Sequence, residues 1–156
     1  EAVAAYVDAH RDEYQLIVTT QDWHIDPGEH FSENPDFVDT WPPHGVAGTD
    51  EAELHPALAN VNADVTVKKG QYKAAYSGFE GTTEDGKTLE EALRDAGITD
   101  VDVVGLAESH CVACTAVDAV HAGFRTRVLR ELTAPVTEEL GAVAREWMTT
   151  EGVLLV

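Results

Sequence analysis

The sequence is poor in cysteine and in basic residues, and it contains no long hydrophobic run. Its only two cysteines are Cys111 and Cys114, too few for the disulfide framework of a small secreted protein. No apolar stretch approaches the roughly 20 residues of a membrane-spanning helix, and the first residues lack the basic and apolar regions of a signal peptide. We therefore expect a cytoplasmic protein that does not bind membranes.

Acidic residues greatly outnumber basic ones. The 156 residues include 29 Asp and Glu against 10 Lys and Arg, a formal net charge of −19. Because this charge repels phosphates, we do not expect nucleic acid as a partner. The acidic excess fits a solvated surface adapted to high salt or a bias of composition alone. The length predicts one domain, residues 1–156, large enough to bury a core without disulfides or a structural metal.

Short apolar runs alternate with segments of helical periodicity along the chain. We predict strands at 16–20, 63–68, 101–107, 125–129 and 153–156, and helices at 2–13, 89–96, 111–122 and 138–149. This alternation is typical of an α/β fold with a parallel sheet covered by helices on both faces. In such sheets ligands bind beyond the carboxyl ends of the strands. Functional side chains are therefore expected at Asp22, His24, Lys69 and 108–111.

Cys111 closely follows a predicted buried strand and begins a predicted helix. Unpaired amide groups and the helix dipole at such a position favour a thiolate, which suits a nucleophile. The alternatives are a small buried residue and a redox pair with Cys114, although Cys-Val-Ala-Cys comes late in the chain for a redox motif. Lys68 and Lys69 end another strand at the same sheet edge. Because neighbouring side chains in a strand point to opposite faces, only one of them can reach the thiol.

Histidine and aspartate gather in the irregular segment that follows the first strand. In an extended chain Asp22 and His24 point the same way, and His30 and His44 can return from the following loop. Imidazoles with one carboxylate suit zinc, manganese or iron. The alternative is a polar loop in which the histidines bind no metal. The interleaved aromatic residues fit either a loop packed on itself or an apolar pocket beside the metal; they are Trp23, Phe31, Phe37 and Trp41.

Four segments, in this order, resemble the nicotinamidase/pyrazinamidase family of isochorismatase-like cysteine hydrolases: QDWHIDPGEHF, WPPHG, KGQYKAAYSGFEG and VVGLAESHCVACTA. The resemblance implies a three-layer sandwich with a six-stranded parallel sheet flanked by helices. It also implies the family activity, which is hydrolysis of nicotinamide, and often of pyrazinamide, to the acid and ammonia in NAD salvage. The partner would be a small-molecule amide, and we expect a monomer or small homo-oligomer.

The resemblance also implies a role for each matching residue. Cys111 would be the nucleophile and Lys69 the catalytic lysine. The backbone amides of Ala107 and Cys111 would form the oxyanion hole, with a cis peptide bond before Ala107. One divalent ion (zinc, manganese or iron) would be held by Asp22, His24 and His44, joined in some family members by His30. The pocket for the substrate ring would be formed by Trp41, Tyr76 and His110.

The sequence departs from the family pattern at two places. The catalytic aspartate of the family lies in a D-x-Q-x-D-F segment at the end of its first strand, and this sequence contains no such segment. We therefore expect that an N-terminal strand is missing from it. Gly45 replaces a cysteine of some family members at a position that is not catalytic. The alternatives are another amidase of the superfamily acting on a carbamoyl substrate, against which the Asp-x-His loop argues, and a catalytically retired metal-binding domain.

Overall fold

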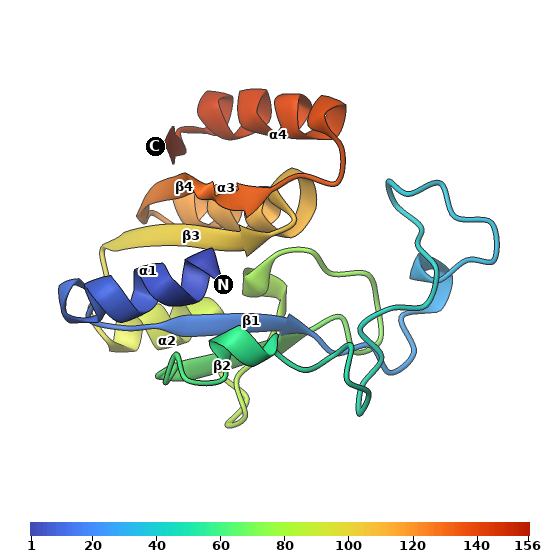
Figure 1. Cartoon of the computed structure of the whole chain (residues 1–156), viewed down its shortest axis with the longest axis horizontal. Coiled ribbons are helices and arrows are strands. Elements are labelled where there is room, and N and C mark those ends of the chain that lie inside the picture. The colour runs from blue at the N-terminus through green and yellow to red at the C-terminus, as the bar shows by residue number, and fades with distance from the viewer.

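The structure is a computed structural model that describes all residues from Glu1 to Val156. Its strands are β1 (Val18–Asp22), β2 (Val65–Lys69), β3 (Asp100–Leu106), β4 (Arg125–Ala134) and β5 (Leu154–Leu155). Its α-helices are α1 (Ala2–His10), α2 (Leu89–Asp95), α3 (Ala113–His121) and α4 (Glu138–Glu151). A π-helical turn precedes α3, and short 3-10 turns occur at 11–13, 28–30, 56–58 and 78–80. The predicted strands and helices are therefore all present, with shifted ends (Figure 1).

Every pair of adjacent strands is parallel, which confirms the predicted α/β class. The expected single sheet is nevertheless divided in two, since β1 pairs only with β2, and β3, β4 and β5 form the second sheet. The reason is a cavity of about 890 Å³ that is lined by side chains of both β1 and β3. Paired strands lie about 4.8 Å apart, so β1 and β3 cannot bond across this space.

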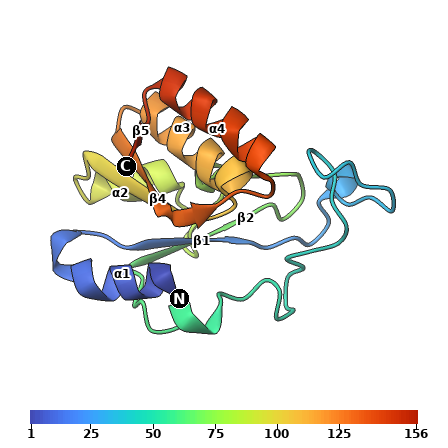
Figure 2. The same cartoon turned by 45° about the horizontal axis from the view of Figure 1, so that its top comes forward.

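Two apolar clusters hold the helices against the sheets. One lies between the second sheet and helices α3 and α4, with Val103, Val117, Val128 and Met148 among its buried residues. The other lies between the first sheet and helices α2 and α3, with Val67, Leu89, Leu93 and Ala119 among its members. Helix α3 therefore contributes to both clusters and joins the two sheets. Figure 2 shows α3 and α4 side by side, and no helix combines the length and apolar character that a membrane span requires.

Local signals explain where the helices begin and end. At the start of α2, the hydroxyl of Thr88 accepts a bond from the Glu91 amide while the Glu91 carboxylate accepts one from the Thr88 amide, which is a capping box. Thr137 caps α4, and Gly152, at φ +100°, ends it in the left-handed conformation that glycine adopts without steric cost. The long irregular segment between β1 and β2 contains no α-helix and projects from the end of β1 (Figure 1).

Candidate active site

A buried lysine links the ends of β1 and β2 to the thiol of Cys111. Lys69 is only 3% exposed and lies opposite Asp22 in the parallel register. Its ammonium donates to the Asp22 carboxylate, to the Ala75 carbonyl at 3.3 Å and to Cys111 Sγ at 3.6 Å. These three acceptors match the three donors of an ammonium, as burial of this charge requires.

The charges of this group determine its pKa shifts. Burial lowers the pKa of Lys69, but the Cys111 thiolate and the Asp22 carboxylate outweigh burial, so the pKa is raised. Burial raises the pKa of the Cys111 thiol, and Lys69 only partly opposes it. The expectation of a lowered thiol pKa was therefore wrong: Lys69 and the backbone amide of Ala107 do lower this pKa, but burial outweighs them. Asp22 already offsets the lysine charge, and Cys111 lies within the turn Glu108–Val112 rather than at the first residue of α3.

Lys68 shows why only one of the two lysines reaches the thiol. Its ammonium lies 3.5 Å from the ring centroid of Trp23, on the other face of β2 from Lys69, as the alternation of strand side chains requires. A cation over an aromatic ring is a stabilised surface contact. The structure thus brings Lys69, and not its neighbour, to Cys111.

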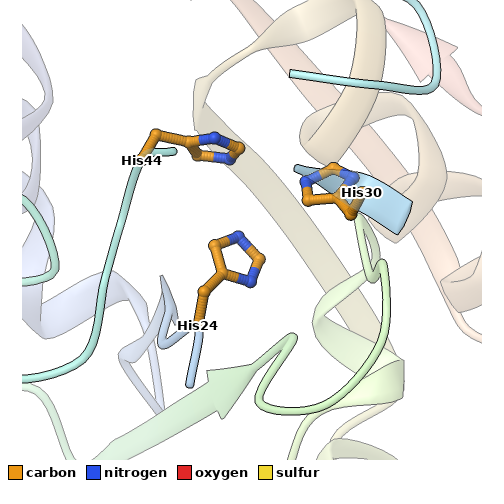
Figure 3. A group of neighbouring side chains, drawn as sticks. All are labelled: His24, His30 and His44. Carbon is orange, nitrogen blue, oxygen red and sulfur yellow. The ribbon is translucent and has the colours of Figure 1, made fainter. Parts of the chain in front are cut away.

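Three histidines converge near the end of β1 (Figure 3). His24, His30 and His44 each offer one nitrogen, and these nitrogens lie within 4.8 Å of one another. In each ring Nδ1 lies near a backbone carbonyl oxygen, at 2.7, 3.3 and 2.8 Å respectively; the carbonyls belong to Gly70, Asp39 and Pro42. Because a carbonyl oxygen only accepts, Nδ1 carries the proton, and Nε2 keeps a lone pair for a metal.

The histidine cluster fits a divalent metal ion on two further observations. His24 Nε2 is buried without any hydrogen-bond partner, an arrangement that is costly unless a ligand completes it. Burial and the neighbouring His24 and His44 lower the pKa of His30, which favours the neutral imidazole that metals bind. Gly70 makes the close approach possible, because a Cβ there would lie 2.5 Å from His24 Cε1.

Asp22 lies between the histidine cluster and the lysine. Its Oδ2 is 4.0 Å from His24 Nε2, while Oδ1 accepts from Lys69. It does not belong to the group formed by the three histidines, so its role as a metal ligand stays a prediction. The sequence argument did not foresee its pairing with Lys69, although the end-to-end alignment of two parallel strands could have suggested it.

The three residues expected to hold the substrate ring gather beside the histidine cluster. The indole N–H of Trp41 donates to the Tyr76 hydroxyl at 3.1 Å, and that hydroxyl donates to the Val38 carbonyl at 3.1 Å. The His110 ring lies 5.3 Å from Trp41 and 5.4 Å from Tyr76, measured between centroids. Tyr76 also lies 5.8 Å from His30. Aromatic rings therefore adjoin the histidine cluster.

The turn that carries Cys111 has its own supports. The Leu106–Ala107 peptide bond is cis, as the resemblance implied. The Ala107 carbonyl accepts from the amides of His110 and Val112, both at 3.1 Å, and Thr115 Oγ1 donates to the Cys111 carbonyl at 2.6 Å. Sequence reasoning missed Thr115 and also Ser109, whose hydroxyl bonds His110 Nδ1 at 2.9 Å. Hydroxyl residues two positions before and four positions after the nucleophile were the available signal.

Comparisons with known proteins agree with these features. The model of the isochorismatase domain matches residues 1–154. The nicotinamidase/pyrazinamidase of Mycobacterium tuberculosis is 48% identical over 155 residues, which cover 99% of this chain and 83% of that protein. A nicotinamidase of Acinetobacter baylyi is 37% identical over 134 residues, and the match spans 74% of this chain but only 62% of that protein.

Among solved structures, the pyrazinamidase of Pyrococcus horikoshii in complex with zinc is similar, with a TM-score of 0.80 and 33% identity. The match covers 99% of this chain and 82% of that one. The resemblance drawn from the four sequence segments is confirmed by the family model and by these relatives. The chain therefore belongs to the isochorismatase domain family.

Proposed function

We propose that the protein hydrolyses nicotinamide to nicotinate and ammonia, and that it also accepts pyrazinamide. The observation that carries this proposal is the position of Cys111, 3.6 Å from a buried ammonium and on the same turn as His110, which faces the aromatic group at the histidine cluster. A nucleophile, a cation and a binding surface for a flat heteroaromatic ring thus converge. The names of the similar proteins from M. tuberculosis and A. baylyi support the same substrate class.

In this mechanism the Cys111 thiolate attacks the carboxamide carbon, and the oxygen gains negative charge. The backbone amides of Ala107 and Cys111 would stabilise that charge, each donor contributing about 3–4 kcal/mol in comparable hydrolases. The aspartate that the family resemblance implies would take the proton of the Cys111 thiol before attack and return it to the nitrogen. The C–N bond then breaks, the nitrogen departs as ammonia, and a thioester on Cys111 remains. Water hydrolyses the thioester and regenerates the thiol. Lys69 would hold the thiolate throughout, because its charge offsets the cost of burying that anion.

The ring would be held by residues of this chain on two sides. Trp41, Tyr76 and His110 would enclose the substrate ring. Burial lowers the pKa of His110, which keeps its imidazole neutral. His24, His30 and His44 would hold a divalent ion, with zinc, manganese and iron all compatible with imidazole ligands and Asp22 as a further ligand. When bound, that ion would supply an electrophilic site for the pyridine nitrogen.

We also propose that a sixth strand lies in parallel between β1 and β3, in a single domain with residues 1–156. The cavity there supports this proposal, since it is lined by Val18 and Thr20 of β1, by Val101 and Val103 of β3 and by Cys111. Strands β1 and β3 are each paired on one side only, so the other edge of each is free to pair with a strand between them. An apolar strand ending near Cys111 would carry the proton-transferring aspartate that the family resemblance implies.

Ammonia release from nicotinamide tests both proposals. The assay would compare residues 1–156 with a version extended at its N-terminus, and the metal content of each would be measured. The variants Cys111→Ala and Cys114→Ala would be made in both forms. We expect turnover in the extended form, loss of it in Cys111→Ala and retention in Cys114→Ala. Absence of turnover in both forms with metal bound would contradict the proposed substrate. Loss of turnover in Cys114→Ala as well would favour a redox pair.

A further inference from the structure

A buried carboxylate lies at the first residue of the turn that carries Cys111. Glu108 is only 2% exposed, and both of its oxygens are bonded. Oε1 accepts from Arg145 of α4 at 2.5 Å, and Oε2 accepts from the Thr133 hydroxyl of β4 at 2.9 Å. A buried carboxylate is costly unless it is paired in this way. The turn is therefore bonded through one side chain to a helix and to a strand.

Thr133 reaches Glu108 because of an irregularity in the second sheet. Val103 of β3 lies opposite Val128, but Gly105, two residues on, lies opposite Thr133. The additional residues of β4 in this interval bring Thr133 next to the carboxyl end of β3, where the turn begins. Irregularities of this kind in a strand redirect side chains near functional sites.

Arg145 is itself fixed on two sides. Its second terminal nitrogen pairs with Glu138 in the first turn of α4. Its guanidinium also occupies space that Gly141 leaves open, since a Cβ at Gly141 would lie 2.9 Å from Arg145 Nη1 and 2.8 Å from Pro135 Cβ. The planar guanidinium thus has one orientation in which it serves both carboxylates.

We propose that Glu108 and Arg145 are positioning residues for the Cys111 nucleophile. Their ion pair fixes the backbone of 107–112, and through it the direction of the thiol and of the neighbouring backbone amides. This role rests on the proposed amide hydrolysis. Stability alone does not account for the pair, because apolar side chains of similar volume often stabilise a protein as well as a buried ion pair does.

The test compares a broken pair with a removed pair. Arg145→Met leaves the Glu108 carboxylate buried with only a hydroxyl partner, whereas Glu108→Gln with Arg145→Met removes both charges and keeps a side chain able to bond Thr133. The matched control is Arg125→Met, which breaks the exposed pair of Arg125 with Asp100 at the opposite end of β3 and β4. Three quantities would be measured on the metal-loaded, N-terminally extended protein: Tm, kcat and KM for nicotinamide, and amide hydrogen exchange of 107–112.

In the double variant we expect a Tm close to that of the parent, a fall in kcat of about tenfold and a KM within about twofold. Amide exchange should be about tenfold faster in 107–112 and unchanged elsewhere. The control should match the parent throughout. A double variant with parental kcat and parental exchange would overturn the proposal, as would exchange that is faster across the whole protein.

The exchange measurement separates this proposal from the proposed substrate. If the parent protein does not hydrolyse nicotinamide, the proposed function fails while local exchange in 107–112 still reports whether the ion pair fixes the turn. If Arg145→Met does not fold, the double variant alone supplies the comparison. A lower Tm in that variant with parental local exchange would assign the pair to stability and contradict the proposal.

Discussion

Removing the ammonium beside Cys111 should slow the chemistry of the thiol without any need for substrate. In Lys69→Met an apolar side chain of similar length replaces the cation, so packing changes little. The buried thiol then keeps the burial that raises its pKa and loses the charge that opposes it. Asp22, deprived of its partner, places an unbalanced negative charge near the sulfur. Both effects disfavour the thiolate.

The size of the effect follows from the geometry. Two unit charges about 4 Å apart interact with about 4 kcal/mol at an effective dielectric constant near 20, and Lys69 Nζ lies 3.6 Å from Cys111 Sγ. Asp22 keeps its charge in the variant, so the whole lysine–thiolate interaction of about 4 kcal/mol is lost. At a fixed pH below the thiol pKa, that is about a thousandfold less thiolate.

Alkylation by iodoacetamide measures the thiolate directly, with mass spectrometry separating Cys111 from Cys114. Cys114 is the internal reference, because burial raises its pKa to about 11. Lys68→Met is the matched control, since its ammonium lies over Trp23 on the opposite face of the same strand. We expect alkylation of Cys111 at pH 7 to slow about a thousandfold in Lys69→Met only. A parental rate in that variant, or equal slowing in Lys68→Met, would refute the electrostatic argument.

Three further changes have defined outcomes. In Gly70→Ala the new Cβ would lie 2.5 Å from His24 Cε1, so zinc affinity, measured against a competing chelator, should fall about 10- to 100-fold. Burial raises the pKa of Asp102, but hydrogen bonds from Arg127 and Tyr14 outweigh burial and lower it. Because Asp102→Asn removes the charge that these bonds stabilise, it should lower the free energy of unfolding, measured with urea at pH 7, by about 1.5–3 kcal/mol. Trp41→Phe removes the donor to Tyr76 and should raise KM for nicotinamide about fivefold, with kcat retained.

Each change has a control within the chain. Gly86 also has a positive φ, but a Cβ there meets nothing within 4 Å, so equal loss of zinc in Gly86→Ala would contradict the steric argument. The Asp102 carboxylate stabilises the fold fully above its ordinary pKa near 3.8 and loses that effect as the pH falls through its lower folded value. The parent and Asp102→Asn should therefore converge in acid. An unchanged KM in Trp41→Phe would exclude the indole contact from substrate binding.

The sequence predicted the elements of the fold well because helix and strand periodicity are local properties. The strand predicted at 16–20 lies at Val18–Asp22 and the helix predicted at 138–149 at Glu138–Glu151, where Thr137 and Gly152 set the ends. The division into two sheets could not be predicted in this way, because it depends on which distant strands pair. The same holds for the irregular register of β4, which no local pattern encodes.

The candidate site was likewise predictable where it depends on local patterns and not where it depends on the packing of distant elements. The residues beyond strand ends were found from the sequence because parallel strands direct their carboxyl ends to one edge, and alternation separated Lys69 from Lys68. The bonds from three Nδ1 atoms to backbone carbonyls were not foreseen, since they depend on the path of an irregular loop. The pKa of Cys111 was misjudged in sign because burial and the charge of Asp22 arise only when distant elements pack together.

The distance between thiol and ammonium is determined by how the two sheets are held together. Lys69 belongs to the first sheet, whereas Cys111 lies in the turn that follows β3 of the second sheet. No strand of one sheet pairs with a strand of the other. The distance between the sheets is therefore set by helix α3, which packs in both apolar clusters. The Gly78 amide adds a direct link by donating to Thr115 Oγ1 at 2.9 Å, and Thr115 in turn bonds the Cys111 carbonyl. A strand that filled the cavity between β1 and β3 would bond to both sheets and thereby fix the same distance that determines the charge on the nucleophile.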